Sequence, residues 1–357
     1  MNILDKVFVV YSFDIADEII FKKIKNLLEE KYTLIHNTKR SDISYSRKPL
    51  EFRFGEIFLK DLNKKAEIFM KIYDFGVISL LFEISYNNLD SQIIKDIKYR
   101  VTEEEYLLSE ARRVVSEVVD VISIGIKENI YDITNFKDWE EYIIVEIHNE
   151  KSDFNNKELS SIFYESTKGR SLNNKEYYYY DSKALINFDL AIFIGDEDFF
   201  DCINIAEFAN VYLLELRYYD FVLDESIDKI ESLLEEIKTD KWVGFGRKFV
   251  KKVNKLNSLI FKISVDLLRN IDKVKNGLKF LGDLEINYIY QGLVKQLQLE
   301  IWKESIEMKL EYLHNLSEFL GQDIKEERMD RMESMMLIME ILMVLLWIWE
   351  IVLLFLE

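Results

Sequence analysis

The apolar run from Met335 to Leu356 constrains this chain more than any other part of the sequence. It contains 22 residues, of which 20 are apolar. A helix rises about 1.5 Å per residue, so the run would be roughly 33 Å long, enough to cross a hydrocarbon core of about 30 Å. The sequence therefore predicts one transmembrane helix, over residues 335–357.

Two acids, Glu340 and Glu350, interrupt this run and decide how it can sit in a membrane. If each acid is counted like an Asp at the centre of the helix, it raises the free energy of membrane insertion by about 2.5–3.5 kcal/mol. The two acids together then nearly cancel the gain from the neighbouring apolar side chains. Insertion then requires the acids to be protonated, to reach an interface or to face another helix. Both acids share one helical sector, so we expect helix packing through them and a homo-oligomer. The alternative is a core helix of a water-soluble oligomer.

The overall charge excludes one broad class of function. A net charge of −18 would repel a phosphate backbone, so we expect no DNA binding, and any contact with RNA would need a local basic patch. With Cys202 as its one cysteine, the chain can form no internal disulfide. The N-terminus lacks the basic and long apolar regions of a signal peptide. We therefore expect the N-terminal body to lie in the cytoplasm, with the membrane contacted by the C-terminal helix.

Residues 1–200 have the pattern of a mixed α and β domain. The clearest element is a hairpin in which Asp74, Phe75 and Gly76 join two β-rich runs. Periodicity of apolar residues assigns the other elements. The predicted strands are 7–13, 67–73, 77–85, 142–148 and 187–195, the helices are 17–31 and 103–126, and an irregular Tyr-rich insertion covers 152–180.

From residue 201 onward the periodicity is helical. A bridging helix over 201–245 is followed by a helical hairpin over 246–334, in which a shorter helix at 284–297 precedes a long helix starting at Trp302. Two apolar seams in this hairpin have the alternating four and three spacing of paired helices. They are Phe249, Val253, Leu256, Ile260, Ile263 and Leu267, and Ile306, Leu310, Leu313, Ser317, Leu320 and Ile324.

Opposite charges on the two arms favour an antiparallel pair. Residues 246–282 carry ten Lys or Arg against two Asp, whereas residues 300–333 carry ten Asp or Glu against five Lys or Arg. The fold class predicted from the sequence is thus an α+β N-terminal domain, a long antiparallel, coiled-coil-like helical stalk and one C-terminal transmembrane helix.

A dense group of cations at the start of the hairpin is the candidate binding strip, and two interpretations stay open. The strip can dock RNA or anionic lipid, or it can pair with acids inside the stalk. It consists of Arg247, Lys248, Lys251, Lys252 and Lys255.

The sequence carries no recognisable catalytic motif. No nucleophile triad, zinc motif or glycine-rich phosphate loop occurs, and His148 at the end of a strand is read as structural. Asp196, Asp198 and Asp201 follow a buried strand and are candidate metal ligands, while capping of the next helix explains the same acids. We expect no catalytic residues, no cofactor and no enzymatic activity.

Three stretches of the chain resemble one protein family. They are ANVYLLELRYYDFVLDESIDKI at 209–230, MKLEYLHNLSEFL at 308–320 and RMDRMESMMLIMEIL at 328–342. Together they look like the fungal meiotic-nuclear-division proteins, with their mitochondrial and plastid relatives and prokaryotic membrane-protein cousins. In that family's C-terminal pattern, Arg328, Met329, Asp330 and Glu340 would match. The resemblance implies an α/β domain, a helical stalk, one C-terminal anchor and a non-enzymatic role.

The resulting hypothesis is a membrane-anchored oligomeric scaffold or adaptor. It would present a cytosolic α/β domain and recruit ribosomes, RNA or a protein partner through the basic strip. The alternative is a metal-dependent hydrolase or a nucleotide-binding sensor tethered to the membrane, using the acids after the buried strand.

Overall fold

The computed structural model divides the chain into two compact units. Unit 1 comprises Met1–Tyr219 and Arg269–Glu304, and unit 2 comprises Asp220–Leu268 and Ser305–Glu357. The residues that the structure describes are 4–35, 43–45, 47–103, 105–127, 139–148, 162, 175–179, 182–241, 246–275, 278–280 and 284–356. An N-terminal domain of mixed α and β structure and a helical C-terminal part are therefore present, as the sequence predicts.

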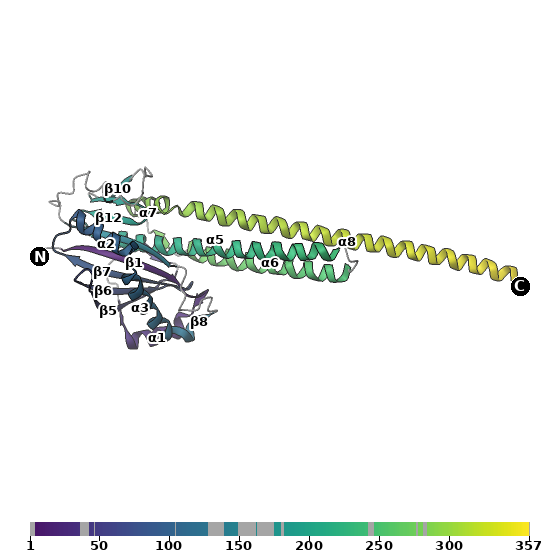
Figure 1. The fold of residues 1–357 in the computed structure, drawn as a ribbon, viewed down its shortest axis with the longest axis horizontal. Helices are drawn as coiled ribbons and strands as arrows, with labels where there is room; N and C mark the ends of the chain where they lie inside the picture. The colour runs from purple at the N-terminus through teal and green to yellow at the C-terminus, as the bar shows by residue number, and fades with distance from the viewer. Residues whose placement is uncertain are drawn as a thin grey trace. The chain divides into compact units, whose positions relative to one another are not determined.

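Unit 1 is built on one large sheet, whose strands are labelled in part in Figure 1. Among the described residues its strand order is β10-β11-β12-β9-β1-β7-β6-β5-β3, and every neighbouring pair is antiparallel except β9 and β12. Two short ribbons, β2 with β8 and β4 with β13, lie outside it. The strands are β1 (Asp5–Asp14), β2 (Glu18–Ile19), β3 (Thr33–Leu34), β4 (Ile43–Tyr45), β5 (Leu50–Leu59), β6 (Lys64–Ile72), β7 (Val77–Tyr86), β8 (Ile126–Lys127), β9 (Trp139–Ile147), β10 (Lys175–Tyr179), β11 (Ser182–Ile186), β12 (Leu190–Ile194) and β13 (Leu278–Phe280).

The predicted hairpin is confirmed as β6 and β7. Its turn needs glycine at position 76, because Gly76 has a φ of 107° and an added Cβ would lie 1.4 Å from the carbonyl oxygen of Ala16. The same close approach lets the Gly76 carbonyl accept a hydrogen bond from the Ile15 N–H at 3.0 Å. The turn is thereby tied to the end of β1, which sets the order of the three central strands.

One face of the sheet is apolar and covered by three helices, α1 (Phe21–Lys31), α2 (Ser91–Glu103) and α3 (Tyr106–Ile122). Alternate side chains of the central strands, such as Val7, Val9 and Tyr11 of β1, join the buried face of these helices in one core. Helix α3 contributes eight buried apolar residues at helical spacing. This periodicity is what made α3 predictable from the sequence.

The opposite face of the sheet is covered by the first part of α5 (Phe200–Lys241). Asn210 of α5 donates hydrogen bonds to Ser12 Oγ at 3.1 Å and to the Glu140 carbonyl at 3.2 Å, which places the helix over β1 and β9. These contacts put α5 up to Tyr219 in unit 1. The helix was predicted only as a bridge, because its contacts with the sheet are distant in sequence.

Helix α7 (Leu284–Gln296) also belongs to unit 1, although the sequence analysis placed it in the stalk. Figure 1 shows it beside β10. The Tyr177 ring of β10 stacks edge-on against Tyr288, and a Cβ on Gly292 would lie 2.7 Å from the Tyr177 ring. The Tyr-rich segment predicted to be irregular thus ends in a strand, β10, that α7 covers.

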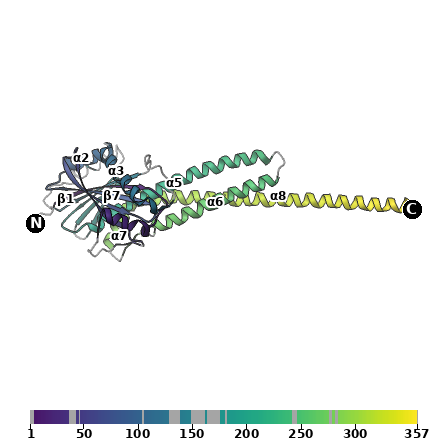
Figure 2. The same cartoon turned by 90° about the horizontal axis from the view of Figure 1, so that it is seen from below.

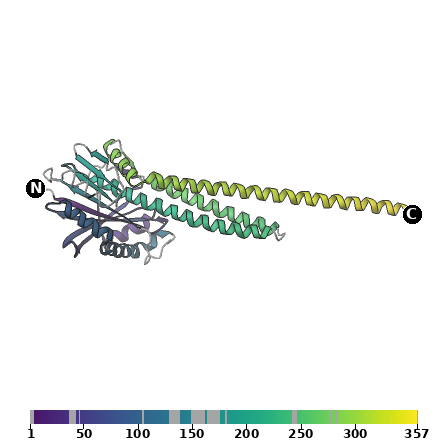
Figure 3. The ribbon, with the colours of Figure 1, turned by 45° about the horizontal axis from the view of Figure 1, so that its top comes forward.

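Unit 2 consists of α6 (Gly246–Lys275) up to Leu268, α8 (Leu299–Leu356) from Ser305, and the end of α5. Figures 2 and 3 both show these three helices side by side. Lys309 of α8 lies 2.7 Å from Asp220 of α5, and Tyr312 donates to Glu231 at 2.9 Å, so α5 and α8 run in the same direction. The second half of α5 is therefore a third helix beside the predicted pair.

The predicted apolar seams of α6 and α8 are largely buried: of their described side chains six are buried, and Ile263, Leu310 and Ser317 are half-buried. Val253, Leu256 and Ile260 of α6 and Ile306, Leu313 and Leu320 of α8 are at most 2% exposed. Ser317 Oγ, within the α8 seam, lies 3.2 Å from Asn257 Oδ1. The alternating spacing was thus a reliable signal, because a seam repeating every three to four residues returns to one helix face.

Helix α8 runs without a break through residues 299–356, so the long helix predicted from Trp302 and the apolar run after it form one helix. Within the residues that the structure describes, no helix is both long enough and apolar enough to span a membrane. Of the predicted span, the side chains of 348 and of 350–357 lie outside the described residues.

Candidate functional site

The basic strip predicted from the sequence lies on α6. Lys251 and Lys255 are exposed, while Lys252 is half-buried and has an interaction partner. The side chains of Arg247 and Lys248 lie outside the described residues. Two lysines of the strip therefore face solvent on a helix that buries its apolar seam, and both interpretations of the strip stay predictions.

Of the two predicted helix-packing acids, Glu340 is described and is exposed on α8. The Glu350 side chain lies outside the described residues. Around Glu340 the apolar side chains are exposed as well: Met339 is 63% exposed and Ile341 is 55% exposed. Nothing described in unit 2 covers this part of the helix.

The three acids proposed as metal ligands surround the start of α5. Asp198 Oδ1 accepts a hydrogen bond from the Phe200 N–H at 3.2 Å, which is the capping interaction that the sequence offered as the alternative. Asp196 is exposed and Asp201 is buried. Among the described residues, no three His, Cys, Asp or Glu side chains are grouped so that they could hold a metal ion.

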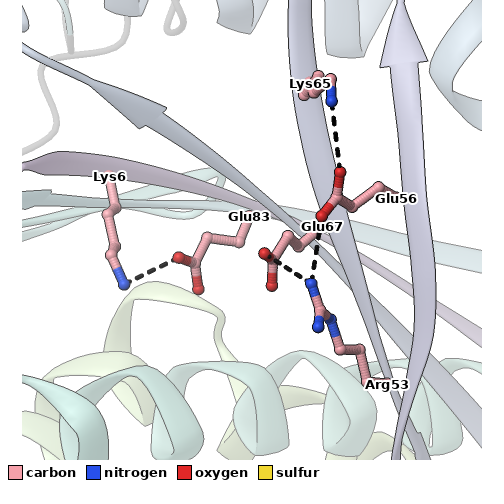
Figure 4. Close-up of polar contacts among 6 residues, drawn as sticks. All are labelled: Lys6, Arg53, Glu56, Lys65, Glu67 and Glu83. Carbon is pink, nitrogen blue, oxygen red and sulfur yellow. Dashed lines mark hydrogen bonds and ion pairs between the residues drawn. The ribbon is translucent and has the colours of Figure 1, made fainter. Parts of the chain in front are cut away.

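A row of charges crosses the sheet on the face that α5 covers in part (Figure 4). Glu83 of β7 is directly opposite Glu67 of β6, which is directly opposite Glu56 of β5. Facing carboxylates repel, so this row requires cations. They are supplied by Lys6, 2.8 Å from Glu83, and by Arg53, 2.8 Å from Glu67 and 3.3 Å from Glu56.

The row leads into a cavity of about 260 Å³ between the sheet and the first turns of α5. All of its described lining residues belong to unit 1. Their chemistry is mixed, with charged groups from both the strands and the helix and three phenylalanine rings. The lining residues are Lys6, Phe8, Ile35, Glu51, Phe69, Met70, Lys71, Leu81, Glu83, Glu146, Asp198, Phe200, Ile203, Asn204 and Glu207.

A buried ion pair between Lys71 of β6 and Glu207 of α5 forms one wall of this cavity. The Lys71 ammonium also donates to Asn204 Oδ1 at 2.6 Å. Burial is the largest single effect and would lower the pKa of Lys71, but Glu207 together with Tyr45 and Glu51 outweighs it, so the pKa lies above its ordinary value. The Lys71 side chain is 12% exposed and that of Glu207 is 1% exposed, so the two charges neutralise each other where little water reaches them.

Glu146, at the end of β9, adds a second polar group to the cavity wall and pairs with His148, which does not belong to the described lining. His148 Nε2 lies 2.9 Å from Glu146 Oε1, and the His148 backbone N–H donates to Asp5 Oδ1 at 3.1 Å. Burial raises the pKa of Glu146 above its ordinary value, although His148 and Lys6 oppose the shift. His148 is thus held on two sides, in keeping with the structural role predicted for it.

No motif in the sequence pointed to this cavity. Two signals were available: Lys71 interrupts an apolar strand, EIFMKIY, and Glu207 interrupts an apolar helix, CINIAEFANVYLLEL. A charged residue in such a run needs a partner, because an isolated charge is costly to bury. Which partner it has could not be read from the sequence, since the two residues are 136 positions apart.

Comparison with known proteins places a similarity in the first part of unit 1. Residues 5–162 match a family model described as the N-terminal domain of the uncharacterized protein MJ0711. The uncharacterized protein MJ0711 of Methanocaldococcus jannaschii is 26% identical over 150 residues, which are 41% of this chain and 44% of that protein. The matched stretch thus spans less than half of the relative's length.

The matched residues include β1 to β9 and α1 to α3. They therefore contain the three helices and most of the strands that form the apolar core on the face of the sheet that these helices cover. They do not include α5, which supplies Glu207 to the cavity, or the helices of unit 2. Both the family and the relative are described as uncharacterized. The resemblance to the fungal meiotic-nuclear-division family stays a prediction.

Proposed function

We propose that this chain is a non-enzymatic membrane-anchored scaffold, held in the bilayer by residues 335–357, with its α/β domain in the cytoplasm. The observation that carries this proposal is the exposure of α8 after Met335. From Met335 to Trp349, apolar residues are between 53% and 72% exposed wherever the side chain is described. Residues 335–349 make about four turns, so apolar side chains occur on every side of the helix, with Glu340 as the one charged residue whose side chain is described among them.

An uncovered helix of this kind needs an apolar environment. Burying one large aliphatic side chain is worth about 1.5–3 kcal/mol, and more than ten such side chains are exposed here. A single soluble chain does not leave an apolar surface of this extent in water. Lipid covers all sides of a helix at once, which is why we favour an anchor over a soluble assembly.

Glu340 supports an oligomer within the membrane. A carboxyl group surrounded by lipid is costly, and contact with the same group of another copy removes it from the hydrocarbon. We therefore propose that the anchor helix associates with other copies through the Glu340 side.

The exposed lysines of the basic strip support a role in recruitment. Lys251 and Lys255 face solvent on α6, so an anionic partner such as ribosomal RNA can reach them. Reversing the charge of Arg247, Lys248, Lys251 and Lys255 to Glu is expected to abolish co-sedimentation with ribosomes at low salt. The matched control reverses four exposed lysines of unit 1: Lys22, Lys23, Lys48 and Lys60. Equal binding by both variants would remove the strip from the proposal.

The anchor is tested by flotation of the full-length protein reconstituted with phosphatidylcholine vesicles, after washing at alkaline pH. We expect the protein to float with the vesicles and the double variant Leu342→Lys, Leu346→Lys to stay in the dense fractions. A double variant with the same added charge, Phe319→Lys and Met308→Lys, changes exposed apolar residues outside the span and is expected to float. Recovery of the unaltered protein in the dense fractions would overturn the anchor.

A further inference from the structure

One buried oxygen on the wall of the cavity has no partner among the described residues. Glu207 is 1% exposed; its Oε2 pairs with Lys71, while its Oε1 accepts no hydrogen bond. Buried carboxylate oxygens are nearly always satisfied, because an unpaired one loses its hydration without compensation. Since Glu207 lines the cavity, a small rotation about the soft terminal torsion of its carboxylate lets a donor placed in the cavity satisfy this oxygen.

The charges around the cavity indicate the sign of that donor. The described lining residues include five carboxylates, Glu51, Glu83, Glu146, Asp198 and Glu207, and two cations, Lys6 and Lys71. Both cations are already paired, Lys6 with Glu83 and Lys71 with Glu207. The surplus of carboxylates attracts a cation and repels phosphates and carboxylates. This charge balance argues against a nucleotide as the occupant.

The remaining walls indicate an organic cation. Phe8, Phe69 and Phe200 line the cavity, and aromatic faces attract an ammonium group while also covering an apolar body. A hard metal ion such as Ca²⁺ would need six to eight oxygen ligands, whereas the described residues contain no group of three metal-ligating side chains. The cavity, at about 260 Å³, is slightly smaller than typical small-molecule sites of about 300–1,000 Å³.

We propose that this cavity binds a small organic amine in its ammonium form. The ammonium group donates a hydrogen bond to Glu207 Oε1, and the apolar part of the ligand lies against the three phenylalanine rings. An ammonium group has three donors, so it can satisfy this oxygen and face a second carboxylate of the wall at the same time. This site is independent of the membrane anchor, because each described residue that lines it belongs to unit 1.

The test is calorimetric titration of the full-length protein in detergent micelles at neutral pH with 2-phenylethylamine. Two probes of similar size control for charge: 2-phenylethanol, which is neutral, and phenylacetate, which is an anion. We expect saturable binding of the amine, at least tenfold weaker binding of the alcohol and no binding of phenylacetate. No saturable heat with the amine, or equal binding of amine and phenylacetate, would overturn the proposal.

Two variants locate the binding. Glu207→Gln removes the charge that faces the ligand and is expected to raise the Kd of the amine at least tenfold, because a hydrogen bond to a charged group is lost. Its control is Glu67→Gln, which removes an acid from the same face of the sheet but outside the lining, and is expected to change the Kd less than twofold.

The second variant separates a loss of binding from damage to the fold. Because Glu207→Gln also weakens the ion pair with Lys71, Ile203→Phe is used to fill the cavity while leaving both charges in place. Its far-UV circular dichroism is expected to be unchanged and its binding of the amine lost. Unaltered binding by a folded Ile203→Phe variant would show that the amine binds elsewhere, including in the micelle, and would contradict the proposal.

Discussion

The face of the sheet that α1, α2 and α3 cover and residues 335–349 of α8 have similar apolar compositions but opposite environments. Val7, Val9 and Val115 in the sheet core are 0% exposed, whereas Val344 and Leu345 on α8 are 58% and 55% exposed. The side chains do not differ in chemistry; they differ in whether other parts of the chain reach them. An apolar pattern therefore determines that a segment must be covered, while the covering element is determined elsewhere in the chain or outside it.

The sharpest test of this comparison is Phe82→Ala in the sheet core. Phe82 is 0% exposed and contacts the Tyr11 ring edge-on at 6.1 Å. We expect the free energy of unfolding to fall by about 3–5 kcal/mol, because a large cavity is left in a region that cannot collapse. Chemical denaturation of the protein in detergent, followed by near-UV circular dichroism, measures it. A loss below about 1 kcal/mol would contradict a tightly packed core.

A second test uses the ion pair buried inside unit 1, which is an exception to the apolar core: two charged side chains are buried there, each with the other as its partner. Lys71→Met leaves Glu207 buried and unpaired, and we expect a loss of about 3 kcal/mol. The double variant Lys71→Met, Glu207→Leu removes both charges, and its stability is expected to be close to that of the unaltered protein. Denaturation of the two variants side by side checks this. If the single and double variants are equally destabilised, the loss is not caused by leaving Glu207 without its partner.

The third test compares one substitution at two places on α8. Leu313 is 0% exposed and Leu342 is 53% exposed. Leu313→Ala is expected to destabilise unit 2 by about 2–4 kcal/mol, whereas Leu342→Ala is expected to change the free energy of unfolding by less than about 0.5 kcal/mol. Thermal denaturation of each variant in the same detergent provides the measurement. A large effect at Leu342 would mean that residues of this chain cover it.

The smallest expected effect concerns Glu141, an acid at the edge of the apolar face. Burial, followed by the charge of Glu140, raises the pKa of Glu141 from 4.5 to about 7. The folded chain therefore holds a proton that the unfolded chain has released, so stability is full below pH 4.5 and is lost as the pH rises through 7. We expect Glu141→Gln to stabilise the protein by roughly 1–2 kcal/mol at pH 8 and by nothing at pH 4.

The control for this last prediction is Glu29→Gln, an exposed acid on α1, which is expected to leave the pH dependence of stability unchanged. Denaturation midpoints between pH 4 and pH 8 measure both variants. A pH profile of Glu141→Gln that runs parallel to that of the unaltered protein would show that Glu141 does not carry the buried proton.

Much of the fold could be predicted from local pattern. The β6–β7 hairpin follows from Asp74-Phe75-Gly76 between two β-rich runs, α3 follows from its helical periodicity, and the seams of α6 and α8 follow from their spacing. Each of these depends on residues within a few positions of one another, so the sequence alone contains the information. The continuous helix α8 belongs to the same class.

The candidate site was not predictable, because its residues come together only in the folded chain. The cavity needs Glu207 of α5 to meet Lys71 of β6, 136 positions earlier, across a sheet whose order is not the order of the chain. The docking of α7 on β10 is decided in the same way, by Gly292 meeting the Tyr177 ring. By itself the sequence determined the elements with a strong local pattern, such as the β6–β7 hairpin and α3, but not β5 or α2, and it determined that the apolar run after Met335 needs a cover. Only the tertiary structure decided which side chains meet, because contacts between distant residues depend on how the whole chain closes.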